Sequence, residues 1–196
     1  FMILPIVAYG TPVLKKKGTD ITPEYPAFDQ LLQNMWETMY AANGVGLAAP
    51  QVGIGIRLFI VDASPFADDD ALTEEEQQQL TGFKKVFINP QIEESGEEWA
   101  FNEGCLSIPD VREDVYRQEE IHILYWDENF KEHQEVYTGL AARVIQHEYD
   151  HIEGVLFTDK LSPLKKRLIK GKLNNIAKGN IDVDYKMRFP LASKKR

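Results

Sequence analysis

The sequence contains a single cysteine, only four histidines and no long apolar run. One cysteine excludes an intrachain disulfide, and no hydrophobic stretch reaches the length of a membrane span. Basic residues are also outnumbered, 22 against 31 acidic residues, and the net charge of −9 argues against general nucleic-acid binding. The first residues lack the basic start and long apolar core of a signal peptide. We expect a cytoplasmic protein without membrane contact or sequence-specific nucleic-acid binding.

The 196 residues, 43% of them hydrophobic, suit one domain that spans residues 1–196 and buries a substantial core. Residues 28–40 carry apolar side chains at helical spacing, which predicts an amphipathic N-terminal helix. Short apolar or alternating segments predict strands at 57–61, 86–89, 98–101, 111–116, 120–126 and 131–137. The turn at 127–129 predicts that the last two strands form a hairpin.

Two segments are dominated by charge. Residues 64–82 are acidic and polar, which predicts a solvated surface insertion, and Thr73 and Glu76 match a capping box at the start of a short helix. Residues 161–176 are basic and predict a C-terminal helix that begins near Ser162-Pro163. Residues 179–196 have no pattern that fixes their path.

Residues 147–151, His-Glu-Tyr-Asp-His, carry the strongest chemical signal. Histidines four positions apart lie on one face of a helix, so both imidazoles can reach one metal ion. The glutamate beside the first histidine, Glu148, then lies where it can take a proton from a water at the metal. This spacing predicts a catalytic metal site.

The helix that carries the motif is predicted to be central. Leu140 and Val144 continue the stripe of His147 and His151 with apolar side chains, so this face should point inward toward a pocket. Arg143 interrupts the apolar pattern at one edge. Because strands lie on both sides of the helices along the chain, we predict an α+β fold with antiparallel or mixed sheets packed around this helix. An N-terminal helix and a C-terminal helix complete it.

A catalytic site of this kind usually takes three protein ligands and leaves one position open. Downstream of His151 there is no further histidine, and Glu153 points to another face of the helix. His122 and His133 lie in the predicted hairpin, where surface or strand histidines are common. Cys105 is the remaining candidate. A lone cysteine is more often a small buried residue, but the glycine beside it and the missing ligand favour coordination.

Three separated motifs resemble those of the peptide deformylase family. They are Gly-Val-Gly-Leu-Ala-Ala-Pro-Gln at 44–51, Glu-Gly-Cys-Leu-Ser at 103–107, and Gln-His-Glu-Tyr-Asp-His at 146–151. Their order and approximate separations match the family, and the resemblance covers roughly residues 2–175. The family removes the formyl group from the N-terminal formyl-methionine of newly synthesised proteins. The resemblance therefore implies a metal-dependent amidohydrolase that acts on N-formylmethionyl peptides and releases formate.

The resemblance also implies roles for individual residues. Cys105, His147 and His151 would hold the metal, with water in the fourth position. Glu148 would be the general base and then the acid that protonates the departing amine. For Gln51, whose side chain would donate to the oxyanion together with the backbone N–H of Leu106, the alternative is a plain loop residue. Further residues match substrate-contacting positions: Gly44, Val45, Gly46, Ile108, Arg112, Leu140, Arg143 and Val144.

Two features of this sequence leave alternatives open. Better-known members often have an aliphatic residue where Arg143 stands, so the far wall of the predicted pocket is not fixed. Glu103 and Arg117 form either a pair that braces the Cys105 loop or an ordinary surface pair.

Two rival functions share the helix motif. One is a peptidase that cuts internal bonds, and the other is a non-catalytic protein with a closed metal site, which would need a fourth ligand.

The metal and the partners follow only in part. A thiolate with two imidazoles suits Fe²⁺, Zn²⁺, Ni²⁺ or Co²⁺. The resemblance implies Fe²⁺ in the cell, with the other ions in purified protein. It also implies ribosome contact through the basic C-terminal helix, for which a solvated helix face is the alternative. The basic residues of that helix are Lys165, Lys166, Arg167, Lys170 and Lys172.

Overall fold

The computed structural model describes residues 1–193. The helices are α1 (Phe28–Ala41), α2 (Glu74–Leu80), α3 (Gly139–Ile152) and α4 (Pro163–Lys178). The strands are β1 (Ile6–Val7), β2 (Gly46–Ala48), β3 (Leu58–Asp62), β4 (Lys84–Cys105), β5 (Ile108–Trp126), β6 (Glu132–Thr138) and β7 (Met187–Arg188). Within residues 1–193, none of the helices is long and apolar enough to cross a membrane.

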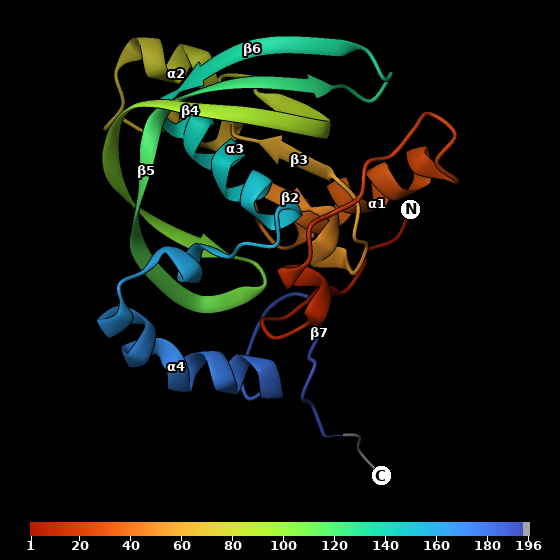
Figure 1. The fold of residues 1–196 in the computed structure, drawn as a ribbon, viewed down its shortest axis with the longest axis vertical. Coiled ribbons are helices and arrows are strands. Elements are labelled where there is room, and N and C mark those ends of the chain that lie inside the picture. Colours follow the sequence, from red (N-terminus) through yellow and green to blue (C-terminus); the bar gives the residue numbers. More distant parts are fainter. Residues whose placement is uncertain (194–196) are drawn as a thin grey trace.

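Five strands form one antiparallel sheet in the order β2-β3-β4-β5-β6. The strands β4 and β5 are long, and their pairing shifts register at three places, which lets them bend around α3 (Figure 1). The prediction of separate short strands at 86–89, 98–101, 111–116 and 120–126 was wrong in this respect. Each register shift interrupts the alternation of one continuous strand, so the pattern is broken although the strand is not.

The helix α3 lies in the middle of the molecule, as predicted (Figure 1). Its side chains Val144, Ile145 and Ile152 are buried in an apolar cluster with Phe59 and Phe87 of the sheet. The helices α1 and α4 bury their apolar faces in two further clusters on either side. The α+β fold with a central motif helix, an N-terminal helix and a C-terminal helix is confirmed.

The acidic insertion is more than a solvated loop. The predicted capping box forms at the start of α2, where Thr73 and Glu76 exchange hydrogen bonds. Leu80 is buried, and Phe66 packs against the cluster around α3. The insertion therefore packs apolar side chains against the core, while its acidic side chains face solvent.

The chain returns to its own beginning after α4. Ser162 caps the helix N-terminus, with Pro163 in the first turn, as the sequence predicts. Gly179 ends the helix with a positive φ of 77°, which glycine adopts without strain. Residues 180–189, which we call the C-terminal arm, then run to β7, which pairs in parallel with β1.

Candidate active site

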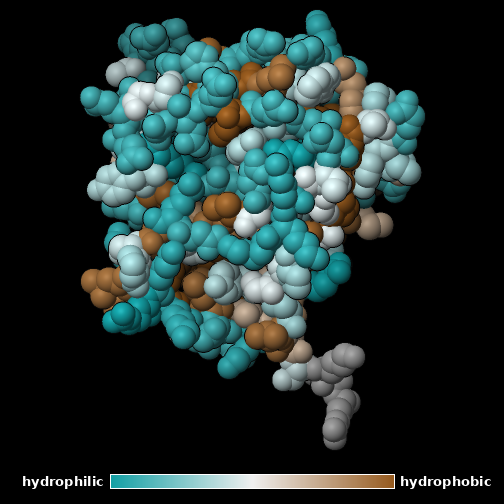
Figure 2. Space-filling model, viewed as in Figure 1, coloured by the Kyte–Doolittle hydropathy of each residue, from teal (hydrophilic) through white to brown (hydrophobic). Residues whose placement is uncertain are grey.

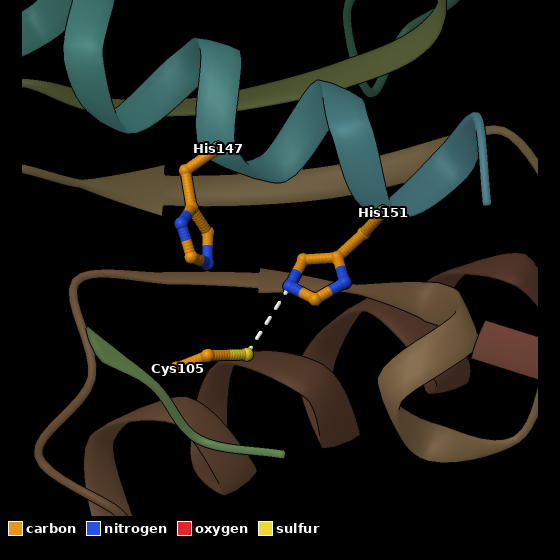
Figure 3. Close-up of side chains that lie close together, drawn as sticks. All are labelled: Cys105, His147 and His151. Carbon is orange, nitrogen blue, oxygen red and sulfur yellow. Dashed lines mark hydrogen bonds between the residues drawn. The ribbon is translucent and has the colours of Figure 1, made fainter. Parts of the chain in front are cut away.

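Three side chains that are distant in the sequence converge between β4 and α3. Cys105 lies at the end of β4, and His147 and His151 lie one turn apart on α3 (Figure 3). One potential ligand atom from each lies within 4.8 Å of the others, and Cys105 Sγ is 3.4 Å from His151 Nε2. In a tetrahedral zinc site, with bonds of about 2.0–2.3 Å, sulfur and nitrogen ligands are about 3.6 Å apart. The spacing of this Cys–His cluster therefore fits one metal ion.

The carboxylate of Glu103 contacts the cluster at His147 and is itself contacted by two arginines. Arg117 contacts it through Nε and Nη2 at 2.7 and 3.0 Å, Arg143 Nη1 donates at 2.7 Å, and His147 Nδ1 lies 2.9 Å away. Burial alone would raise the pKa of Glu103, but these contacts outweigh it and hold the pKa well below its usual range. Because His147 uses Nδ1 toward Glu103, its other nitrogen is left for a metal. The alternative of an ordinary surface pair for Glu103 and Arg117 was wrong, because both side chains are buried.

Arg143 joins the helix to the long hairpin. Its side chain is 2% exposed, and it donates to the carbonyl oxygens of Trp99 and Val115 at 2.6 and 2.9 Å. The guanidinium also lies over the Trp99 ring, 4.5 Å from the centroid. The residue that interrupts the apolar stripe in the sequence is therefore a buried link between α3, β4 and β5.

Glu148 is as deeply buried as Glu103 but is not paired. Its side chain lies in the cavity described below, and Oε2 has no hydrogen-bond partner within the described residues. Burial raises its pKa to about 7 in the metal-free chain. Gly46 leaves room for it, since a Cβ at that position would lie 2.5 Å from Glu148 Oε1.

The two histidines differ in their electrostatic surroundings. Burial alone would lower the pKa of His147, but its contacts with Cys105 and Glu103 raise the pKa to about 10. Burial and the neighbouring His147 hold the pKa of His151 well below its usual value. A cation in the cluster would compete with protons, because a coordinating imidazole nitrogen must be unprotonated.

Gln51 and the turn at 105–107 complete the site. The side-chain oxygen Oε1 of Gln51 accepts a hydrogen bond from the backbone N–H of Ala48 at 3.0 Å. This contact directs the side-chain nitrogen of Gln51 toward the cluster. That nitrogen lies 3.4 Å from Cys105 Sγ and 3.3 Å from Ser107 Oγ. Contacts therefore hold both the oxygen and the nitrogen of the Gln51 side-chain amide, unlike those of a plain loop residue.

A cavity of about 590 Å³ opens beside the cluster. Most residues expected from the sequence line it, namely Gly44, Val45, Gly46, Gln51, Cys105, Leu106, Ile108, Arg112, Arg143, Val144, His147 and Glu148. Leu140 is not among the lining residues within 1–193 and instead packs against the apolar cluster around α3. Arg112 binds the side chain and backbone of Asn102, both at 2.8 Å.

Sequence reasoning missed several lining residues, including Phe66, Phe101, Asp182, Asp184 and Tyr185. Phe66 stands in the acidic insertion, which its composition marks only as solvated surface. Residues 182–185 follow α4, where no motif or periodicity indicates a role. Only the path of the folded chain brings these residues to the site.

The family model for polypeptide deformylase matches residues 3–167. The chain belongs to this family. It is 68% identical to a peptide deformylase of Christiangramia forsetii and 62% identical to one of Flavobacterium johnsoniae, each alignment covering 100% of both chains. Among solved structures, a peptide deformylase from Legionella pneumophila is similar with a TM-score of 0.76 and 34% identity, covering 91% of this chain and 97% of that chain.

Membership in this family settles the reaction. Deformylases hydrolyse the N-formyl group of N-terminal formyl-methionine on newly synthesised peptides, and the chain is a metal-dependent hydrolase of this kind. The two rivals considered from the sequence, an internal-bond peptidase and a non-catalytic metal protein, are therefore set aside. The family assignment does not by itself give each residue its role.

Proposed function

We propose that Cys105, His147 and His151 hold the metal required for deformylation and that Glu148 is the general base. The observation that carries this proposal is the convergence of the Cys–His cluster beside a buried carboxylate with an unpartnered oxygen. The donor set of one thiol and two imidazoles, with its spacing, fits one divalent cation.

The residues of the chain divide the remaining work. A divalent cation bound here would lower the pKa of water and polarise the formyl oxygen. Glu148 takes a proton from the attacking water and delivers it to the departing amine nitrogen. The Gln51 amide and the Leu106 backbone N–H donate to the oxygen on which negative charge develops.

The substrate lies along the β2 side of the cavity in this proposal. The backbone of residues 44–46 pairs with the formyl peptide as an added strand, and Arg112 contacts the peptide backbone at the rim. Ile108 and Val144 receive the methionine side chain, and Leu140 supports them from the apolar cluster. The buried Arg143 closes the far wall, where an aliphatic residue is common in the family.

Anaerobic turnover tests the proposal directly. The protein is loaded with Fe²⁺ and given formyl-Met-Ala-Ser or Met-Ala-Ser, and formate and free amine are followed. We expect formate from the first peptide while the second stays intact. Cleavage of an internal peptide bond, or no formate from a fully loaded sample, would contradict the proposal.

The ligand set is tested by metal content. Cys105→Ser replaces the thiolate with a hydroxyl, so metal retention after dialysis should fall, whereas His122→Ala should retain as much metal as the wild type. His122 is a matched control because its side chain is 56% exposed and it was an alternative ligand in the sequence. Loss of metal from the control alone would reverse the assignment.

We further propose Fe²⁺ as the ion used in the cell, with Zn²⁺, Ni²⁺ or Co²⁺ able to occupy the same donors. A thiolate donates more charge to the ion than a carboxylate, so Zn²⁺ in this site should be a weak Lewis acid. Turnover numbers of matched Fe²⁺ and Zn²⁺ forms decide the point. Equal rates would remove the reason for preferring iron.

The helix α4 supports a proposal of ribosome contact in the cytoplasm. Lys166, Arg167, Lys170 and Lys172 are exposed, while Lys165 lies 3.5 Å from Glu113. Leu164 and Leu168 are 62% and 72% exposed on the same helix, and Figure 2 shows hydrophobic atoms among hydrophilic ones over this end of the molecule.

Ribosome sedimentation tests this contact. Replacing the five basic residues of α4 by Gln should abolish co-sedimentation, and binding of the wild type should weaken steeply with salt. Replacing Lys15, Lys16 and Lys17, an exposed basic run elsewhere, is the control. Binding that survives the α4 replacements would exclude this helix as the docking element.

We also propose that residues 1–196 form one catalytic domain.

A further inference from the structure

The C-terminal arm is fixed along one wall of the catalytic cavity. Near its end, the N–H groups of Ile6 and Ala8 donate to the carbonyl oxygens of Lys186 and Arg188, each at 2.9 Å. Beyond β7, Leu191 N–H donates to Ala177 O, also at 2.9 Å. Residues 182–185 lie before these contacts and line the cavity. The arm lies beyond the family match, which ends at residue 167.

Tyr185 connects the arm to the turn that carries Cys105. Its hydroxyl donates to the carbonyl oxygen of Leu106 at 2.6 Å, across a separation of 79 residues. The ring is partly buried against the cluster of α1 and β3. Burial, together with Cys105 and Asp110, raises the pKa of Tyr185, so the hydroxyl keeps the proton that it donates.

The turn is held from several directions. The N–H of Tyr9 donates to Ser107 O at 2.8 Å, and the Gln51 amide reaches Ser107 Oγ. Both contacts fix the far side of the turn, whereas Tyr185 alone among these residues contacts Leu106 itself. The carbonyl of Leu106 lies in the peptide group that follows its Cα, and its N–H lies in the peptide group that joins it to Cys105. Holding the carbonyl therefore restricts the backbone rotation of Leu106, and with it the directions in which the N–H can point.

We propose that Tyr185 is a positioning residue for deformylation, which acts by holding Leu106 so that its N–H faces the reacting formyl oxygen. This inference rests on the role proposed above for Leu106. An N–H that stabilises charge in the transition state must already be oriented before the reaction, because reorientation during the reaction would cost the energy that it supplies. A hydrogen bond from a side chain anchored between the N-terminal strand and α4 provides that orientation.

Tyr185→Phe removes only the hydroxyl and leaves the ring in the cavity wall. We expect kcat for formyl-Met-Ala-Ser to fall about tenfold or more, the low end of what loss of a supporting hydrogen bond costs at a metal site. KM should stay close to the wild-type value, because the lining surface is kept. Tyr185→Ala, which also removes the ring, should raise KM in addition. Tyr116→Phe is the control, since Tyr116 is 66% exposed on β5.

A second readout needs neither metal nor turnover. Amide hydrogen exchange in metal-free protein should be faster at residues 105–108 in Tyr185→Phe than in wild type or Tyr116→Phe. Unchanged kcat in Tyr185→Phe would overturn the inference, whether or not exchange is faster. A rise in KM without a change in kcat would make Tyr185 a binding residue and also overturn it. Failure of the proposed function is distinguishable, because wild-type protein would then produce no formate.

Discussion

Glu103 and Glu148 are chemically similar and equally buried, each 4% exposed, yet their surroundings are opposite. Glu103 accepts from two arginines and contacts His147, which holds its pKa well below the usual range. Glu148 has an oxygen without a partner, and burial raises its pKa to about 7. The comparison teaches that the number of donors around a carboxylate, and not its depth, separates a fixed charge from a group that can exchange a proton.

The largest effect is expected from replacing Glu148, the carboxylate without a hydrogen-bond partner for Oε2. Glu148→Gln keeps the shape but cannot accept the proton, so kcat should fall about 10³-fold or more. Metal content should match the wild type, because Glu148 is not among the proposed ligands. Formate release and metal analysis on the same samples check both points, with Glu94→Gln on the exposed face of β4 as control. Substantial turnover in a metal-loaded Glu148→Gln sample would reject Glu148 as the base.

The second largest effect is expected from replacing Glu103, the carboxylate that accepts from two arginines. Glu103→Gln leaves Arg143 as a buried charge without a counter-charge and leaves Arg117 with Asp150 alone, so the metal-free protein should lose about 3 kcal/mol of unfolding free energy. Metal affinity should fall about tenfold to a hundredfold because His147 loses its orienting partner. Urea unfolding and competition with a chelator measure the two quantities. Wild-type stability in this variant would mean that the pairs contribute nothing to folding.

A smaller effect separates the two arginines. Arg143→Met removes the donors to Trp99 O and Val115 O but leaves Glu103 paired with Arg117, so the loss should be about 1–2 kcal/mol. Arg117→Met should cost more, since Arg117 makes two contacts with Glu103 and one with Asp150. The two urea unfolding midpoints, compared at one pH, rank the variants. The reverse ranking would assign the main counter-charge to Arg143.

The smallest effect is expected at a third carboxylate, Glu135, which is not among the described residues that line the cavity. Glu135 accepts from the hydroxyl groups of Tyr125 and Tyr137. Burial alone would raise its pKa, but these hydrogen bonds lower it below the usual value. A depressed pKa stabilises the fold above the unfolded-state pKa, and this contribution is lost as pH falls through the folded-state pKa.

Glu135→Gln should therefore cost about 1 kcal/mol near neutral pH, and the difference from wild type should vanish in acid. Unfolding midpoints measured from neutral pH down through the titration of Glu135 test the sign. A difference that grows toward low pH would contradict the assignment. Glu135 would then be uncharged while it is bonded to the two tyrosines, and its environment would resemble neither that of Glu103 nor that of Glu148.

Much of the fold was accessible from the sequence, since its determinants are local. The helix α1 follows from apolar spacing, α4 follows from a basic segment that begins at Ser162-Pro163, and the fold class follows from the order of the elements. The length of β4 and β5 was not accessible, because a register shift disturbs the very alternation by which a strand is recognised.

The candidate site divides in the same way. The spacing within α3 is sufficient to predict that His147 and His151 share a face, and the geometry agrees. The environment of Arg143 was not accessible, because its partners Trp99, Glu103 and Val115 come from other elements. Tyr185 was still less accessible, since its one informative contact spans 79 residues.

The long span of that contact has a consequence for synthesis of the enzyme. The ribosome makes a chain from its N-terminus and domains fold as their segments emerge, so α3 is complete while the C-terminal arm is still being polymerised. A partly made chain thus already contains the three side chains of the Cys–His cluster but lacks β7 and the tyrosine that contacts Leu106. The tyrosine that contacts Leu106 is therefore added only after all three side chains of the Cys–His cluster have been made.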